Sequence, residues 1–363
     1  MRAAFFALLC VAACASATEP QTVQQNPPLP LRLVQATLAP ASENDGGMRD
    51  QALAFVGRED LGGPNYRSVC EGLGLDPITE IVRQSAGHRV VMINEAHDAP
   101  RHRAFIADLA HALRRRGFDI YAAETLFPVR DEAQPWPAVN DGWYSREPVF
   151  GQLLRRARAD GWRFAAYDDM ATPASAVSPD DQMIYRETRQ AENLQSLLAA
   201  NPEARVLVHA GYDHLLETPE EGGLAMMAER LKAATSLDPL TIDQTRNVAP
   251  SDAYVVCDPA RLTPAGIDIR LGTPRLSFEN GRPAWRQALG QKPIYLPAMA
   301  NPSVATIWEA RNADEPDEAV AVDRVLVRPG ETLPFLLAPG RYRAESWSLE
   351  HGWSGAPIEF AVN

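Results

Sequence analysis

From residue 88 onward the chain repeats one order of elements, in which an apolar strand, a short loop and an amphipathic helix lead to another apolar strand. This order predicts βαβ units and a parallel sheet. Strands are expected at residues 89–93, 119–123, 163–167, 205–209, 240–242 and 254–256. Helices are expected at 100–116, 149–159 and 181–200. The first strand is apolar throughout, which is typical of a strand buried on both faces. We therefore expect an α/β domain with a mainly parallel sheet and helices on both faces, spanning residues 48–300.

The pattern of apolar and turn residues in the sequence changes at about residue 301. Short alternating runs such as 324–327 and 332–337 are separated by Pro329-Gly330 and Pro339-Gly340, which is turn chemistry between β-strands. No helical pattern intervenes. Residues 301–363 are therefore predicted to form a small all-β, β-sandwich-like module.

The N-terminus has the charge, apolar core and small-residue order of a secretory signal, which we assign to residues 1–17. Two cleavage sites remain open, a lipobox ending at Cys14 and an A-x-A site at 15–17, and we favour lipidation of Cys14. Residues 18–47 are rich in Gln, Pro and Asn and are expected to be a flexible tether. The sequence thus predicts a periplasmic or outer-membrane lipoprotein that contacts the membrane through its lipid anchor only.

Charge and hydropathy exclude two classes of protein. The formal net charge of −12 would repel a polyphosphate backbone, so nucleic acid is not an expected partner. Beyond the N-terminus no apolar run approaches the roughly 18 residues that cross a bilayer. A small-molecule or peptide substrate is the expected partner. Cys70 and Cys257 would lie in an oxidising compartment, where a disulfide is permitted but not required.

Acidic residues and histidines follow four of the predicted strands. In parallel α/β sheets, ligands bind at the carboxyl ends of the strands. Charged groups there are costly to bury unless they are paired or coordinated. We therefore expect one pocket to contain Glu95, His97, Glu124 and His214. Imidazole beside carboxylates suits general acid/base catalysis or a divalent metal bound by these four residues. His102 fits a packed first-turn histidine and a ligand equally well.

Several familiar motifs are missing from the sequence. It contains no Gly-x-Ser-x-Gly elbow, no His-Glu-x-x-His, no phosphate loop and no Gly-x-Gly-x-x-Gly. Cys-x-x-Cys-His, the attachment motif of covalent haem, is also absent. These absences argue against a serine hydrolase, a nucleotide enzyme and a c-type cytochrome.

The segment 93–102, Ile-Asn-Glu-Ala-His-Asp-Ala-Pro-Arg-His, resembles the Gly-Glu-x-His-Asp-x-Pro-x-His signature of the ChaN-like haem-binding lipoproteins. These belong to one superfamily with the Tiki/TraB proteases and the erythromycin esterases. Glu124 matches a glutamate after the second strand, residues 186–194 look like a helix of the esterase branch, and 211–214 match a Gly-x-x-His motif. The resemblance covers roughly residues 85–220. Asn94 departs from it, because the family has Gly there.

The resemblance implies a hydrolase or a haem binder. As a hydrolase, the protein would use His97 as general base, Glu95 and Glu124 to orient water or bind a metal, and His214 and Arg186 to stabilise an oxyanion. As a haem-binding lipoprotein, it would take an axial ligand from Tyr212, His214 or His102. A third hypothesis keeps the same fold but gives this site no chemical activity, so that the protein would act through its β module.

Overall fold

The computed structural model describes residues 53–59, 68–128, 136–168, 175–219, 223–259, 266–289, 292–296, 302–310, 319–348, 352–353 and 357–363. The side chains of 288–289 and 352–353 are not among the described parts. The predicted signal, Cys14 and the tether lie outside the described residues.

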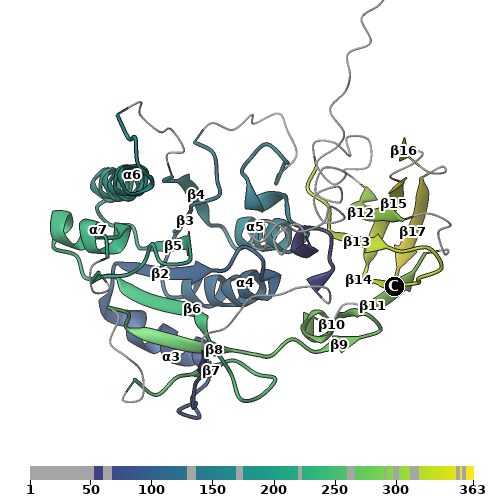
Figure 1. Ribbon diagram of the computed structural model, residues 1–363, viewed down its shortest axis with the longest axis horizontal. Helices are drawn as coiled ribbons and strands as arrows, with labels where there is room; N and C mark the ends of the chain where they lie inside the picture. Colours follow the sequence, from purple (N-terminus) through teal and green to yellow (C-terminus); the bar gives the residue numbers. More distant parts are fainter. Residues whose placement is uncertain are drawn as a thin grey trace, which may run out of the picture.

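An eight-stranded sheet forms the centre of the fold (Figure 1), with the order β4-β3-β5-β2-β6-β8-β7 and β1 paired with β6. Its strands are β1 (Ser68–Val69), β2 (Val90–Glu95), β3 (Ile120–Ala123), β4 (Arg163–Ala166), β5 (Val206–Gly211), β6 (Leu240–Val248), β7 (Val255–Val256) and β8 (Ile269–Thr273). Every pairing is parallel except that of β7 with β8. The predicted parallel α/β class is confirmed.

Helices cover both faces of the sheet (Figure 1). One face carries α3 (Pro77–Gln84), α4 (Pro100–Arg114) and α5 (Pro148–Ala159), and the other carries α6 (Pro179–Ala200) and α7 (Met227–Thr235). Successive residues of β2 alternate between the two cores: Val91 and Ile93 pack against α4 and α5, and Val90 and Met92 lie in the core under α6 and α7. Among the described residues no helix is long and apolar enough to cross a bilayer.

The C-terminal part contains small antiparallel sheets, as the turn chemistry predicts. One sheet contains β12 (Ser303–Glu309), β13 (Asp323–Val327), β15 (Gly340–Ser348), β16 (Gly352–Trp353) and β17 (Ile358–Val362); β11 (Lys292–Tyr295) pairs with β14 (Pro334–Leu337), and β9 (Phe278–Glu279) with β10 (Arg282–Pro283). This part lies beside α5 (Figure 1), where Gln152 Nε2 donates to the Val322 carbonyl at 2.6 Å.

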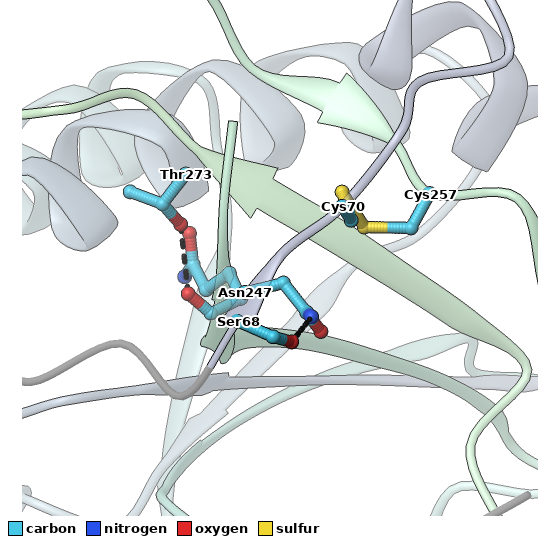
Figure 2. The surroundings of a disulfide bond; sticks show 6 residues. Ser68, Cys70, Asn247, Cys257 and Thr273 are labelled. Carbon is cyan, nitrogen blue, oxygen red and sulfur yellow. Dashed lines mark hydrogen bonds between the residues drawn. A yellow bond between two sulfur atoms is a disulfide. The ribbon is translucent and has the colours of Figure 1, made fainter. Parts of the chain in front are cut away.

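A disulfide joins Cys70 and Cys257 (Figure 2). Their Cα atoms are 5.5 Å apart although 187 positions separate them in the sequence. Beside the bond, Asn247 Nδ2 of β6 donates to Ser68 Oγ of β1 at 2.8 Å (Figure 2). The bond that the sequence permits is thus formed, and it ties the segment after β1 to the segment after β7.

Candidate functional site

The carboxyl ends of β2, β3 and β5 bring polar residues together. Glu95 ends β2, His97 follows it, and Glu124 follows β3. A Cβ added to Gly211, at the end of β5, would lie 2.6 Å from His97 Cε1 and 3.0 Å from Glu124 Oε2, so both side chains meet above this glycine. A cavity of about 10 Å³ lies among them, lined also by Tyr144. That is space for about one water molecule.

His97 is oriented by a carboxylate and by two aromatic rings. Its Nδ1 lies 3.2 Å from Glu95 Oε1, so Nδ1–H donates to the carboxylate and Nε2 keeps a free lone pair. The Tyr144 ring stacks on the imidazole with centroids 3.8 Å apart, and the Tyr212 ring meets it edge-on at 4.9 Å. His97 is thereby held in one rotamer and one tautomer, as a general base requires.

Glu95 is fixed as a buried carboxylate anion. Arg103 Nε donates to Oε2 and Arg103 Nη2 donates to Oε1, both at 2.8 Å, and His209 Nε2 lies 3.0 Å from Oε2. Burial alone would raise the pKa of Glu95, but Arg103 and His209 outweigh it and hold the pKa well below its ordinary value. Glu95 is therefore ionised and can stabilise a protonated His97.

His209 and Tyr121 form a second layer behind Glu95. Burial raises the pKa of Tyr121 well above its ordinary value, so the phenol keeps its proton and donates to His209 Nδ1 at 2.7 Å. His209 Nε2–H then donates to Glu95. The sequence patterns do not predict Tyr121 or Arg103 as site residues. Two features could have pointed to them: Tyr121 is a polar residue in an otherwise apolar strand, and Arg103 directly follows His102.

Glu124 is held by one backbone amide and two cations. Its Oε2 accepts from the Gly211 N–H, and its Oε1 lies 2.5 Å from Arg186 Nη2 and 3.6 Å from His214 Nε2. Burial would raise the pKa of Glu124, but His214 and Arg186 lower it far below the ordinary value. Arg186 is itself anchored by Asp168, with Nη2 to Oδ2 at 2.8 Å. The anionic Glu124 thus lies between His97 and two positive charges.

His214 is a cation in this site. Its Nδ1 lies 2.5 Å from Glu187 Oε1, and Glu187 Oε2 accepts from the Met227 N–H at 2.7 Å. Burial alone would lower the pKa of His214, but Glu124 and Glu187 raise it to about 10. His214 therefore carries a proton at neutral pH. Sequence reasoning missed Glu187, although it directly follows Arg186 in the segment that resembles the esterase helix.

The carboxylate oxygens of the site are already engaged by protein donors. Both oxygens of Glu95 accept from Arg103, and those of Glu124 accept from Gly211 and Arg186. In the described part of the chain, no three or more His, Cys, Asp or Glu side chains form a group that could hold a metal ion. The four predicted metal ligands meet, but they are arranged as ion pairs and do not fit a divalent ion.

Of the three candidate haem ligands, His214 lies in the site described above, and His102 and Tyr212 lie in different surroundings. His102 is fully buried; its Nδ1 accepts from the Ala96 N–H at 3.0 Å and its Nε2 lies 3.5 Å from Thr273 Oγ1. Burial holds its pKa well below the ordinary value, so this imidazole is neutral and braces the turn after β2. Tyr212 is 41% exposed at the rim, where its hydroxyl accepts from the His97 N–H at 3.3 Å. His102 thus does not fit a haem ligand.

Asn94, which departs from the motif that this segment resembles, has a structural use. Its Nδ2 donates to the Tyr212 carbonyl and to Asp243 Oδ1, both at 2.7 Å, and its Oδ1 accepts from the Gln244 N–H at 2.9 Å. The side chain thereby connects β2, β6 and the turn that carries Tyr212. A glycine could make none of these bonds.

Comparisons with known proteins give only distant structural likenesses. No family model and no curated protein matches this sequence. Among solved structures, the type III effector HopBA1 is 15% identical over 57% of this chain and 97% of its own, with a TM-score of 0.36. RRSP, a MARTX toxin effector domain from Vibrio vulnificus CMCP6, is 18% identical over 65% of this chain and 51% of its own, with a TM-score of 0.31. The C-terminal region of Pasteurella multocida toxin, described with a thiol-protease-like catalytic triad, is 12% identical over 79% and 48%, with a TM-score of 0.33. Likenesses this weak carry no argument about activity.

Proposed function

We propose that this protein is a hydrolase that cleaves an ester or amide bond in a small-molecule or peptide substrate. One observation carries the proposal: His97, oriented by the buried Glu95 anion, shares a one-water cavity with Glu124, which is paired with two cations. The proposal includes kinship with the Tiki, ChaN and erythromycin esterase superfamily, because the residues that match its motifs supply this site.

In the proposed reaction, a water molecule lies between His97 and Glu124. His97 Nε2 takes a proton as the water oxygen bonds to the carbonyl carbon. The charge that develops on the carbonyl oxygen is stabilised at longer range by the positive charges of Arg186 and His214, which stay paired with Glu124. The bond to the leaving group then breaks, and His97 returns the proton to the departing oxygen or nitrogen. Glu95 stabilises the imidazolium between the two steps. The products are an acid and an alcohol or amine.

The test is hydrolysis of a panel of p-nitrophenyl esters and of a quenched fluorogenic peptide library by the purified protein. Loss of a general base lowers rates by about 10²–10⁴-fold. We expect His97→Ala to lower kcat/KM on any hit by at least about 100-fold while the melting temperature is retained. His111→Ala is the matched control, because His111 lies on α4 outside the site and pairs with Asp160. The proposal fails if no substrate is turned over or if His97→Ala retains the wild-type rate.

We also propose that the protein is exported and anchored through lipidated Cys14. The Cys70–Cys257 disulfide supports export, because thiols are kept reduced in most cytosols. Cys14→Ala should move the protein from the membrane fraction to the soluble fraction. Unchanged fractionation would contradict the lipid anchor and leave the hydrolase proposal untouched.

A further inference from the structure

Within the described residues, β4 is an edge strand whose outer backbone groups have no strand partner. It is the last strand in the sheet order, and β3 is its partner in the described part of the chain. The Arg163 N–H donates to the Asp119 carbonyl on the β3 side at 2.9 Å. Because alternate residues of a parallel strand face opposite neighbours, Phe164 and Ala166 direct their N–H and C=O groups away from β3. A second backbone could bond to these groups.

A pocket of about 330 Å³ lies beside this edge. That volume is within the range of ligand-binding pockets in proteins. Its lining includes Phe127, Trp136, Arg158, Trp162, Phe164 and Ala166. Phe164 and Ala166 pack with the α4 and α5 side of the core, and the rings of Trp136 and Phe164 are 4.8 Å apart. The pocket therefore combines aromatic side chains with the charged Asp141, Arg158 and Arg163, and it lies on the face of β4 to which Phe164 and Ala166 point.

The same chain segments contribute residues to the pocket and to the catalytic site. Trp136 and Asp141 line the pocket, and a few residues later the same segment places Tyr144 on His97. Thr125, directly after Glu124, accepts from the Ser145 N–H at 3.1 Å and fixes that segment. On the other side, β4 leads to Asp168, which anchors Arg186. A ligand along β4 would therefore end close to the catalytic cavity.

We propose that the β4 edge binds an extended polypeptide from another protein by strand addition, with an apolar or aromatic side chain in the Trp136 and Trp162 pocket. Free N–H and C=O groups in a row are complemented by another backbone. Side chains of an added strand point to alternate faces, so every second one faces the pocket. Pairing of two copies is disfavoured, because Phe164 of a second copy packs on its own Trp136 and cannot fill the pocket.

This site would supply a peptide substrate to the catalytic cavity, a statement that rests on the proposed hydrolase function. Strands lie about 4.8 Å apart, so an added strand runs about 14 Å from β5, at whose end the cavity lies. About four extended residues cover that distance. The substrate would thus be held by β4 through residues about four or more positions from the cleaved bond.

The test uses the His97→Ala variant of the full chain, so that binding is measured without cleavage. The probe is the capped peptide acetyl-Thr-Phe-Thr-Phe-Thr-Val-Thr-amide, and the control is the same peptide with alternate amides N-methylated. Hydrogen exchange is followed at single amides. We expect the probe to slow exchange at Phe164 and Ala166 by about tenfold or more and to leave Ala165, which faces β3, unchanged. Ala166→Pro, which removes an outward N–H, should weaken binding by about tenfold. The N-methylated peptide should not bind.

The outcomes separate this inference from the proposed function. Protection at Phe164 and Ala166 without peptide cleavage by the wild-type protein would support the β4 site and overturn the hydrolase proposal for peptides. Cleavage of the probe without protection at these amides would overturn the β4 site and leave the hydrolase. No binding, or equal binding of the N-methylated peptide, would also overturn it. If protection of these amides instead increases with protein concentration in the absence of peptide, the edge of β4 binds a second copy of the chain. The proposed occupant would then be wrong.

Discussion

Gly211 allows His97 and Glu124 to approach each other. A methyl group at this position would lie 2.6 Å from His97 Cε1 and 2.9 Å from His97 Nε2, so Gly211→Ala must displace the imidazole. A misplacement of about 1 Å at a catalytic group costs on the order of 100-fold in rate. We expect kcat/KM to fall by that order in steady-state assays while the fold is retained. Gly87→Ala is the control, because no atom lies within 4 Å of its added methyl. Full activity of Gly211→Ala would mean that His97 is not positioned as the structure has it.

The charge on His214 makes both stability and the site depend on pH. Its pKa is raised to about 10 in the folded protein, from an ordinary value near 6.5. The stability contributed by the protonated form is therefore complete below pH about 6.5, declines between about 6.5 and 10, and is lost above about 10, with a slope of up to about 1.4 kcal/mol per pH unit. Urea unfolding of the wild type and of His214→Gln, compared from pH 6 to 10.5, checks this. A difference between the two that stays constant across this range would contradict a charged His214.

Single residues of the site differ in how far the sequence predicts them. Glu95, His97, Glu124 and His214 stand directly after apolar strands, so topology alone places them at one sheet edge. Arg103 and Glu187 lie on helices, where a charged residue is most often solvated. Which helical residue turns inward depends on the packing of α4 and α6 against the sheet, and a local pattern does not contain that packing.

At the scale of elements, α5 joins the α/β sheet to the C-terminal sheets. Gly151 lies where they touch, and a methyl group there would lie 2.6 Å from Val320 Cγ1. Gly151→Ala should therefore destabilise the protein by about 1–3 kcal/mol, as overpacking does. Adding Val320→Ala removes the clashing atom and should restore part of that loss. Chemical denaturation of both single variants and of the double variant measures the coupling. Additive effects would show that α5 and Val320 are not in contact.

The four strands with continuous apolar runs could be predicted, and several other elements could not. Residues 89–93, 119–123, 163–167 and 205–209 became β2, β3, β4 and β5 with ends shifted by one or two residues. The nine-residue α7, the eight-residue α3 and the strand β8 were missed. Two or three turns give too few periodic positions to separate a helix from a loop. β8 follows a stretch without periodicity and is stabilised by pairing with its neighbours β6 and β7, which a local sequence pattern does not contain.

On the scale of the whole molecule, the candidate site and the disulfide bond lie at different strands of the sheet. The site lies at β2, β3 and β5, and the disulfide lies at the β1, β7 and β8 side of the sheet (Figures 1 and 2). Cys70 and Cys257 are buried, and a methyl group on Gly272 of β8 would lie 2.7 Å from Cys70 Sγ. The bond therefore joins the segments after β1 and β7 beside β8, and we expect its removal to leave the position of His97 unchanged.

Removal of the disulfide should accordingly lower stability and spare activity. The bond spans 187 positions, and closing a loop of that length in the unfolded chain is worth about 5 kcal/mol in the chain-entropy model. We expect Cys70→Ala/Cys257→Ala to reduce the free energy of unfolding by up to about that amount, and either single variant to lose nearly as much. Urea unfolding measures the loss, and reduced wild-type protein is the control that keeps both sulfur atoms in place. The kcat/KM of the folded variants at 25 °C should equal that of the wild type, because the site strands are unchanged. A double variant as stable as the oxidised wild type would contradict a stabilising bond, and one that is folded but inactive would show that the β7 and β8 edge governs the site.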